Sequence, residues 1–332
     1  MKFQENIPLS KLSHYKIGGI ARYFFAAKNE REIVWAVKEA KNKKLPIFII
    51  GGGTNLLIGD EGWNGLVLKP NIITLELSAH GGSAFGGKGE TLLAGAGVIM
   101  GNLIAFALKN SLSGLEWAGG LPGTFGGAIR GNAGCFGGEI KDSVQLVRSF
   151  DIKTMTIRER VIKECKFGYR NSIFKKKNGN EVILSVELRL IKGDKKKISE
   201  IIKKNIAYRN ENHPLEYPNI GSIFKNVSLA AIHEKGSVKY KKAVADTSLL
   251  YRGSQFSVKT DPLPVISAAK LISEAGLCGV TLGGAMISPK HSNFIVNVLD
   301  ARADDVKSLI TLAKTEVHKK FGITLEEEVQ LV

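Results

Sequence analysis

The chain has 332 residues, of which 44% are hydrophobic, 37 are glycine and 9 are proline. This composition excludes an intrinsically disordered chain and a collagen-like repeat. The 47 lysines and arginines outnumber the 31 acidic residues and give a formal net charge of +16, which indicates an anionic partner: nucleic acid, a membrane surface or phosphorylated small molecules.

The first third of the chain predicts alternating helices and strands. Asn29 and the apolar spacing that follows it predict a helix over residues 29–42. Short apolar runs predict strands over residues 45–50, 65–69 and 72–77. The longest uncharged run, residues 91–108, contains three glycines and alternates like a strand as far as residue 98. These features favour a buried strand that leads into a buried helix over a membrane-spanning helix.

The remainder of the chain has a lysine-rich run, residues 192–197, which interrupts the pattern, opens a helix and predicts a domain boundary. Strands are predicted over 143–152 and 181–191, around a loop over 166–177, and helices over 198–210, 265–275 and 304–321. Residues 227–263 are basic and weakly patterned, and this stretch resembles an insertion.

Two glycine-rich segments are the strongest candidates for a ligand site. In Gly51–Asn55, three glycines expose consecutive backbone N–H groups and the next two residues add side-chain donors, which suits a pyrophosphate. In Gly119–Gly134, Pro122–Gly123 predicts a sharp turn, and Gly126–Gly127 permits close approach of a flat ligand or another strand. Each segment alone is also consistent with ordinary turns, whereas their joint occurrence favours a ligand site.

Three further positions have acid–base character. Arg170 lies between aromatic residues in a loop, where a guanidinium can hold a carboxylate with two hydrogen bonds. Ser222 follows a glycine and precedes Lys225 and Asn226, so it is a candidate proton donor or anion ligand. Glu328 belongs to an acidic cluster near the C-terminus. Residue type and spacing alone favour a structural role for the serine and a solvated one for the glutamates.

Several chemistries are not supported by the sequence. No base stands next to Ser222, so a serine-hydrolase triad has no support. The six histidines never fall at metal-ligand spacing, so we expect no metal site. The three cysteines have no paired spacing, and free thiols in a reducing cytoplasm are the simpler interpretation. The N-terminal residues contain no apolar run, so we expect no secretory signal.

A series of motifs in fixed order identifies a family resemblance. The motifs are IGG, GGGTNLL, GLEWAGGLPGTFGGAIRGNAG, GYR, PNIGSIFKN, KLISEAGLCG, GGAMISPKHSNFIVN and LEEEV. Together they resemble the UDP-N-acetylenolpyruvoylglucosamine reductase family over nearly the whole chain, except residues 227–263. The resemblance implies an α+β fold: an FAD-binding domain of the vanillyl-alcohol-oxidase type over residues 1–195, with subdomains of about 1–68 and 69–195, and a smaller substrate-binding domain over 196–332.

The resemblance also implies a reaction. NADPH reduces FAD, and the flavin passes a hydride to C3 of the enolpyruvyl group of the UDP-sugar, which yields UDP-N-acetylmuramate for peptidoglycan synthesis. Ser222 matches the general acid that protonates C2, and Arg170 and Glu328 match the pair that polarises the substrate carboxylate. The implied FAD-binding residues are Gly51, Gly52, Gly53, Thr54, Asn55, Leu56, Gly119, Pro122, Gly123, Thr124, Gly126, Gly127, Asn132 and Gly134. Tyr169, Lys225 and Asn226 match substrate-binding positions.

The chain departs from the family pattern at three positions. Met286 stands where glutamine is common, Gln330 where arginine is usual, and Val227 where proline follows the asparagine. Because the three catalytic positions are retained, we expect activity, with altered contacts to the UDP group. We further expect a cytoplasmic monomer without membrane insertion.

Two alternatives remain open from the sequence. One is another FAD oxidoreductase of the same fold that acts on a small alcohol or sugar. The other, based on charge alone, is a nucleic-acid-binding protein. The chain contains no nucleic-acid-binding motif, and its aromatic residues are not interleaved with the basic runs. We therefore expect no nucleic-acid partner.

Overall fold

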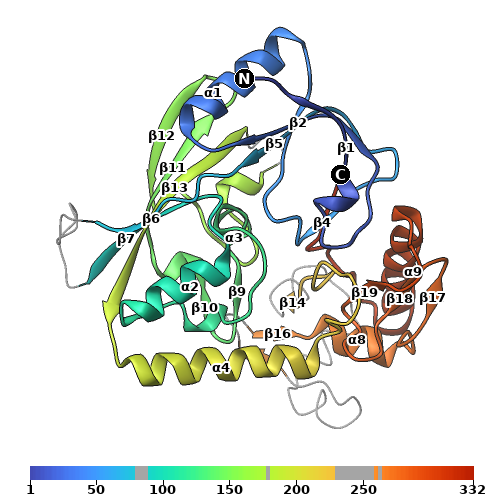
Figure 1. The fold of residues 1–332 in the computed structure, drawn as a ribbon. Coiled ribbons are helices and arrows are strands. Elements are labelled where there is room, and N and C mark those ends of the chain that lie inside the picture. The colour runs from blue at the N-terminus through green and yellow to red at the C-terminus, as the bar shows by residue number, and fades with distance from the viewer. Residues whose placement is uncertain (79–88, 177–179, 229–257, 261–263) are drawn as a thin grey trace. The chain divides into compact units, whose positions relative to one another are not determined.

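The computed structural model describes residues 1–78, 89–176, 180–228, 258–260 and 264–332 (Figure 1). They form two compact units, each built from three chain segments. The first unit contains Met1–Pro8, Ile20–Gly53 and Trp63–Glu211, and the second contains Leu9–Gly19, Thr54–Gly62 and Asn212–Val332. This division differs from the boundary expected at residue 195, because the helix after the lysine run stays with the first unit and two N-terminal segments join the second.

The first unit contains a four-stranded sheet in the order β1-β2-β5-β3. The strands are β1 (Gln4–Pro8), β2 (Ile20–Ala27), β5 (Trp63–Pro70) and β3 (Ile47–Ile49), and only β1 runs antiparallel to its neighbour. Helix α1 (Glu30–Asn42) packs against β2 and β5. It begins where expected, because the Asn29 side chain accepts a hydrogen bond from the N–H of Glu32 at 3.0 Å.

A second, antiparallel sheet of the first unit has the order β12-β11-β13-β7-β6, with β8 also paired to β13. The strands are β6 (Leu75–Leu77), β7 (Glu90–Gly95), β8 (Leu112–Ser113), β11 (Val144–Asp151), β12 (Thr156–Val161) and β13 (Glu181–Lys192). The predicted strand-to-helix run is confirmed, although β7 ends at Gly95 rather than residue 98, and helix α2 (Met100–Lys109) follows.

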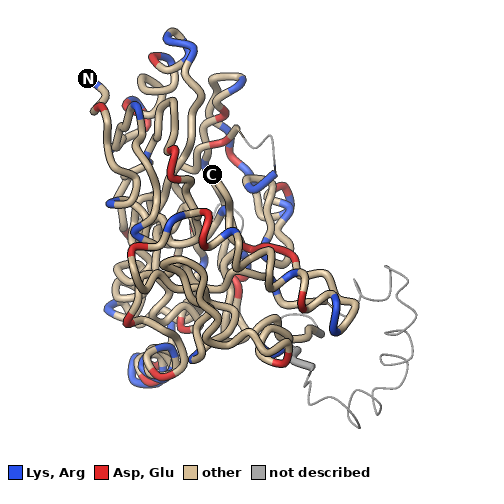
Figure 2. The backbone as a smooth tube through the Cα atoms, turned by 90° about the vertical axis from the view of Figure 1, so that its right-hand side faces the viewer, with Lys and Arg blue, Asp and Glu red and all other residues tan. Residues whose placement is uncertain are grey.

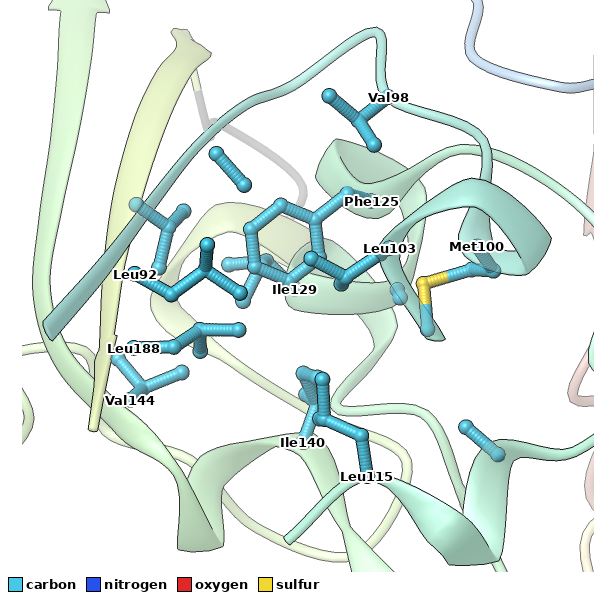
Figure 3. Packing of buried hydrophobic residues seen from close by; sticks show 14 of the residues in the cluster. Leu92, Val98, Met100, Leu103, Leu115, Phe125, Ile129, Ile140, Val144 and Leu188 are labelled. Atoms are coloured by element: carbon cyan, nitrogen blue, oxygen red, sulfur yellow. The ribbon is translucent and has the colours of Figure 1, made fainter. Parts of the chain in front are cut away.

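A hydrophobic core joins this sheet to α2 and to helix α3 (Phe125–Gly131). Phe125 is fully buried and lies among side chains from the sheet and both helices, including Leu92, Leu103 and Ile129 (Figure 3). A small hairpin, β9 (Gly134–Cys135) with β10 (Gly138–Glu139), follows α3. The core therefore anchors the glycine-rich segment from which α3 starts.

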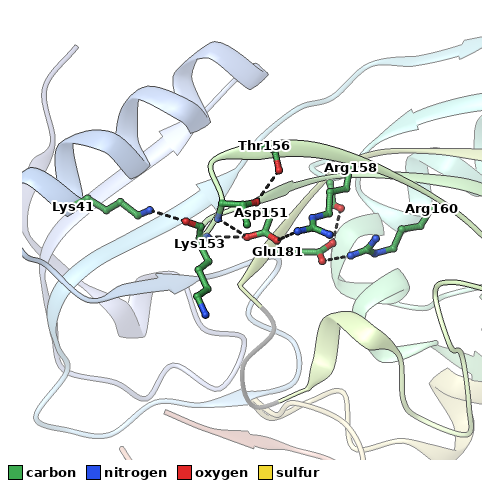
Figure 4. Close-up of polar contacts among 9 residues, drawn as sticks. Lys41, Asp151, Lys153, Thr156, Arg158, Arg160 and Glu181 are labelled. Atoms are coloured by element: carbon green, nitrogen blue, oxygen red, sulfur yellow. Dashed lines mark hydrogen bonds and ion pairs between the residues drawn. The ribbon is translucent and has the colours of Figure 1, made fainter.

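Strand β12 was not predicted from the sequence, and a polar cluster explains its position (Figure 4). Asp151 accepts hydrogen bonds from the N–H groups of Lys153 and Thr154, which turns the chain back on itself. Arg158 pairs with Asp151 at 2.8 Å, and Arg160 pairs with Glu181 of β13. Burial alone would raise the pKa of Asp151, but the two backbone hydrogen bonds and the arginine lower it.

Helix α4 (Lys195–Asn212) begins three residues earlier than expected. The Asp194 carboxylate accepts hydrogen bonds from the N–H groups of Lys196 and Lys197, so the last three residues of the lysine-rich run form the first turn of the helix. Ile198, Ile202 and Asn205 are buried. This inner face attaches α4 to the core of the first unit.

In its described residues, the second unit combines short strands with two α-helices. The paired strands are β4 (Leu56–Leu57) with β20 (Gln330–Leu331); β14 (Val227–Ser228), β16 (Pro264–Ile266) and β15 (Val258–Thr260); and β17 (Thr281–Leu282), β18 (Ala285–Ile287) and β19 (Ile295–Asn297). The helices are α8 (Ala268–Glu274) and α9 (Ala303–Phe321). The helix expected over 265–275 starts later, because Ser267 caps it and the preceding β-branched residues form β16.

The core of the second unit includes side chains from all three of its segments. Tyr15, Leu57 and Ile295 belong to the same buried cluster. The Tyr15 hydroxyl donates to the carbonyl of Ile295 at 2.8 Å, and burial raises the pKa of this hydroxyl well above its usual value. Of the expected insertion over 227–263, both described ends, β14 and β15, pair with β16, and the rest lies outside the described residues.

Candidate functional site

The two predicted glycine segments meet in the first unit. A Cβ placed on Gly52 would lie 2.7 Å from the Cα of Gly123, and one on Gly51 would lie 2.6 Å from the hydroxyl of Thr124. Part of the glycine requirement therefore comes from contact between the two backbones. Gly53 and Gly123 also have positive φ angles of 65° and 102°, which side-chain-bearing residues rarely adopt.

These segments present unused hydrogen-bond donors. Within the described chain, the backbone N–H groups of Gly51, Gly52, Gly53 and Thr124 donate no hydrogen bond to another protein group. The following turn is held from behind, because Phe125 and Gly126 donate their N–H groups to the carbonyls of Val98 and Ala96. Adjacent backbone donors of this kind suit an anionic group such as a diphosphate.

The remaining predicted cofactor residues of this segment differ in exposure. Pro122 and Gly127 are exposed, whereas a Cβ on Gly126 would lie 2.8 Å from the Cβ of Ala96. Gly126 is therefore needed to let α3 approach β7 and the turn that follows this strand. Gly127 is free of such packing and leaves open backbone at the start of α3.

Gly119 is explained by helix packing. A Cβ at this position would lie 2.9 Å from the carbonyl oxygen of Ile202 in α4. Arg209 of α4 donates from Nε to the carbonyl of Gly119 at 2.9 Å and from Nη2 to the Cys135 sulfur at 2.9 Å. It also lies over the Phe136 ring, 5.2 Å from the ring centroid. Sequence reasoning missed Arg209, although its spacing from Ile198, Ile202 and Asn205 places it on the buried face of α4.

Asn132 and Gly134 connect the glycine segment to the Arg170 loop. The Asn132 side chain is fully buried, donates to Glu139 and to the carbonyl of Gly168, and accepts from the N–H of Lys141. Its φ of 45° ends α3 in a left-handed turn. With its side-chain hydrogen bonds satisfied in the protein, Asn132 positions the backbone around it, and its predicted contact with a cofactor stays a prediction.

The predicted carboxylate-binding arginine lies beside this turn. Arg170 donates from Nη2 to the carbonyl of Gly134 at 2.7 Å, and its guanidinium lies 5.2 Å from the ring centroid of Tyr169. Its φ of 52° is left-handed, and Lys175 donates to its carbonyl at 3.2 Å. Tyr169 and Arg170 are both partly exposed. The loop therefore holds the guanidinium in a defined place while leaving part of it accessible.

Ser222 lies in the second unit on a segment with strong backbone constraints. Gly221 has a φ of 81°, and its N–H donates to the Asn219 side chain at 3.1 Å. Beyond the serine, the Asn293 side chain bonds both backbone groups of Phe224. Its Nδ2 donates to the Phe224 carbonyl at 2.8 Å, and its Oδ1 accepts from the Phe224 N–H at 2.9 Å. Sequence reasoning missed Asn293, a buried amide that precedes the apolar run Phe294–Val296.

The structure brings Ser222 and Glu328 onto adjoining segments of the second unit. The carbonyl of Ile223, the residue after the serine, accepts hydrogen bonds from the N–H groups of Glu328 at 2.8 Å and Val329 at 3.3 Å. Glu328 is partly buried. Asn55 adds a further link, because its side chain donates to the Glu328 carbonyl at 3.2 Å.

Other residues singled out from the sequence also belong to the second unit. Leu56 pairs with Gln330 in the β4–β20 ladder, which uses the backbone of Gln330 and so does not depend on its side chain. Thr54, which precedes this ladder, is partly exposed. Met286 lies in β18, away from the serine in sequence but in the same unit.

Lys225 and Asn226 follow the serine and already have protein partners. Lys225 forms an ion pair with Glu326 and has a side chain 18% exposed. Asn226 accepts a hydrogen bond from the N–H of Ala268 at the start of α8. An anionic ligand at Lys225 would therefore compete with Glu326 for the ammonium group.

Other chemistries find no support in the described residues. These residues contain no group of three or more histidine, cysteine or acidic side chains arranged to hold a metal ion. The three cysteines form no disulfide bond. In the portion of the chain that is described, no helix combines the length and apolar character needed to cross a membrane.

Comparisons with known proteins agree with the fold. Residues 21–156 match the model of an FAD-binding domain, and residues 213–332 match the C-terminal domain of UDP-N-acetylenolpyruvoylglucosamine reductase. The second match begins next to the start of the last segment of the second unit. The expected α+β class with an FAD-binding domain is confirmed.

Relatives that match over nearly the whole chain are named UDP-N-acetylenolpyruvoylglucosamine reductases. The reductase of Alkaliphilus oremlandii is 35% identical over 98% of this chain and 91% of its own, and that of Borreliella burgdorferi is 36% identical over 97% and 91%. The crystal structure of UDP-N-acetylenolpyruvylglucosamine reductase from Thermus caldophilus matches with a TM-score of 0.71 and 26% identity over 100% of this chain and 99% of that one. The chain is an FAD-dependent oxidoreductase and belongs to the UDP-N-acetylenolpyruvoylglucosamine reductase family.

Proposed function

We propose that this chain catalyses the NADPH-dependent reduction of UDP-N-acetylglucosamine enolpyruvate to UDP-N-acetylmuramate through FAD. The observation that carries the proposal is the hydrogen bonding of Ile223 to Glu328, which holds the proposed acid, Ser222, and the proposed carboxylate on adjoining segments. Full-length similarity to named reductases supports the substrate class. We place the reaction in the cytoplasm, where these nucleotide ligands occur, and expect a monomer.

The residues present suit FAD. Two contacting segments of the first unit carry four backbone N–H groups that are unused in the described chain, at Gly51, Gly52, Gly53 and Thr124. These groups would hold the diphosphate, and the exposed backbone at Gly127 would allow close approach. When bound, FAD supplies the hydride that NADPH provides and the substrate C3 receives.

Ser222, Glu328 and Arg170 have separate proposed roles. The Ser222 hydroxyl donates the proton that C2 of the substrate acquires, because an uncharged donor can protonate a carbanion-like carbon as charge develops there. Glu328 and Arg170 stabilise negative charge on the substrate carboxylate during the same step. The Tyr169 ring, 5.2 Å from the Arg170 guanidinium, restricts the directions in which this side chain can point.

The net charge of +16 also fits nucleotide ligands. Lysine and arginine are spread over many described segments with acidic residues among them, rather than confined to one continuous band (Figure 2). A nucleic-acid-binding surface would be expected to concentrate basic residues on one face or along one helix. We therefore propose FAD, NADPH and the UDP-sugar as the anionic partners, and no nucleic acid.

The decisive experiment separates flavin reduction from product formation. In Ser222→Ala, we expect NADPH to bleach the flavin at the wild-type rate, while formation of UDP-N-acetylmuramate falls roughly 10²–10⁴-fold. Ser273→Ala, which changes an exposed serine of α8, is the matched control and should leave both steps unchanged. Stopped-flow absorbance follows the first step and mass spectrometry of the product follows the second.

Two results would count against the proposal. Product formation at the wild-type rate in Ser222→Ala removes the serine as the acid. Turnover with oxygen and a small alcohol or sugar, without NADPH, would instead support a different flavin oxidoreductase of this fold.

A further inference from the structure

Arg130 is the one long side chain on an otherwise bare face of α3. The helix buries its other face in the core through Phe125, Ala128 and Ile129. A Cβ on Gly131 would meet nothing within 4 Å, and a Cβ on Gly127 would meet only the Thr124 hydroxyl, at 3.5 Å. Because Gly127 lies three residues before Arg130, the two positions are neighbours on the helix surface.

Among the described residues, the guanidinium of Arg130 has no counter-charge. Across the described segments, no hydrogen bond or ion pair involves this side chain, although the residue is partly buried. By contrast, Arg158 pairs with Asp151 and Arg160 pairs with Glu181. Burial lowers the pKa of Arg130. A partly buried cation without a partner costs stability, so folding alone does not account for an arginine at this position.

The surroundings of Arg130 point to a ligand. Its carbonyl accepts a hydrogen bond from Ser172 at 2.6 Å, two residues after Arg170. Gly134, four residues after Arg130, accepts the hydrogen bond from the Arg170 guanidinium. On the other side, the Cα of Gly127 lies 4.0 Å from a Cβ placed on Gly51. The α3 face therefore adjoins both the diphosphate-binding segment and the loop that carries the carboxylate-binding arginine.

We propose that Arg130 binds an anionic oxygen of a ligand that lies on this open face of α3. The ligand is FAD or the enolpyruvyl sugar nucleotide, and this identification rests on the proposed function. Both ligands carry phosphate oxygens, and the substrate also carries a carboxylate. A guanidinium suits either group, because it offers paired donors in a fixed plane.

Arg130→Gln tests the inference with two titrations. FAD is titrated into the apoprotein and followed by flavin fluorescence, and UDP-N-acetylglucosamine enolpyruvate is titrated into the holoprotein and followed by the flavin absorption spectrum. We expect the Kd of one ligand to rise on the order of ten- to hundred-fold, because one charge-assisted contact is lost. A rise for FAD assigns Arg130 to the cofactor, and a rise for the substrate alone assigns it to the sugar nucleotide.

A second readout separates ligand binding from a structural role. Because the guanidinium has no partner to lose among the residues that the structure describes, the thermal midpoint of the Arg130→Gln apoprotein should equal or exceed that of the wild type. Arg158→Gln is the matched control with the opposite signature: it breaks a 2.8 Å ion pair, so its midpoint should fall while both Kd values stay unchanged. Arg130→Lys should recover part of the lost affinity, because it restores the charge but not the paired donors.

The inference and the proposed function fail in different ways. If the wild-type protein binds FAD and the substrate but Arg130→Gln binds both equally well, the inference is overturned. The same conclusion follows if Arg130→Gln does not fold, because the arginine then serves the structure. If the wild-type apoprotein does not bind FAD, the proposed function is wrong, whatever the variant does.

Discussion

Replacing Asn293 with alanine is the most informative single change in the second unit. Its side chain satisfies both backbone groups of Phe224, with hydrogen bonds of 2.8 and 2.9 Å, and both residues are buried, at 3% and 1% exposure. Alanine removes this amide and leaves the N–H and the carbonyl of Phe224 without these partners. Ser222 lies two residues earlier and depends on the same segment for its position.

The expected loss of stability follows from these two groups. Leaving one buried polar group unsatisfied costs about 1–3 kcal/mol, so two such groups with partial relaxation cost about 3 kcal/mol. At roughly 3 °C per kcal/mol for a domain of this size, the thermal midpoint of the second unit should fall by about 10 °C. Product formation should fall as well, because the segment that carries Ser222 gains freedom.

Amide hydrogen exchange provides the direct assay. In Asn293→Ala, the amide of Phe224 should exchange much faster than in the wild type, and calorimetry should show the lower midpoint. Asn110→Ala is a control in the first unit, because it removes a single side-chain hydrogen bond to the Phe106 carbonyl at the end of α2. Wild-type exchange at Phe224 together with an unchanged midpoint would refute the assigned role of Asn293.

Three further predictions concern the first unit and the thiols. Gly52→Ala places a Cβ 2.7 Å from the backbone of the facing turn, so FAD affinity measured by fluorescence titration should fall. In the control Gly101→Ala, the added Cβ meets nothing within 4 Å and should instead stabilise α2 by about 0.5–1 kcal/mol. Equal behaviour of the two variants would contradict the packing argument. Arg209→Ala should lower the free energy of unfolding of the first unit by about 3 kcal/mol through lost contacts, and so lower its calorimetric midpoint, with Arg209→Lys intermediate. Identical thermograms would remove its role as a link between segments. Burial raises the pKa of Cys165 to about 12, so its thiolate forms only as the pH approaches that value, and alkylation at pH 8 followed by peptide mass spectrometry should label exposed Cys278 long before Cys165. Equal labelling rates would show that the core opens.

Features encoded by neighbouring residues were predictable from the sequence. The Asn29 cap and the apolar stripe after it located α1, and the acidic start of α9 located that helix. Strand β12 was missed because its sequence, TIRERV, has no apolar alternation and is specified by ion pairs to other strands. No local pattern indicates that Leu56 pairs with Gln330.

In the candidate site too, features encoded locally were predicted and features that depend on distant residues were not. The glycines and the proposed catalytic side chains were singled out from residue type, order and family resemblance. The structure brings Gly52 to Gly123 and the Ser222 segment to that of Glu328. The residues that hold these segments in place were missed. Asn293 and Arg209 are a single amide and a single guanidinium, and their function depends on carbonyls that are distant in sequence.

The assembly of the second unit from three distant chain segments has a consequence for biosynthesis. Its core needs Tyr15 and Leu57 from the start of the chain and Ile295 from near its end, so it cannot form until almost all residues have left the ribosome. The segments Leu9–Gly19 and Thr54–Gly62 are synthesised before most of the first unit and before the rest of the second, so most of their packing partners are made later. Contacts over such separations slow folding. A fragment that starts at residue 213, although it matches a complete family model, lacks part of its own core and should not fold alone.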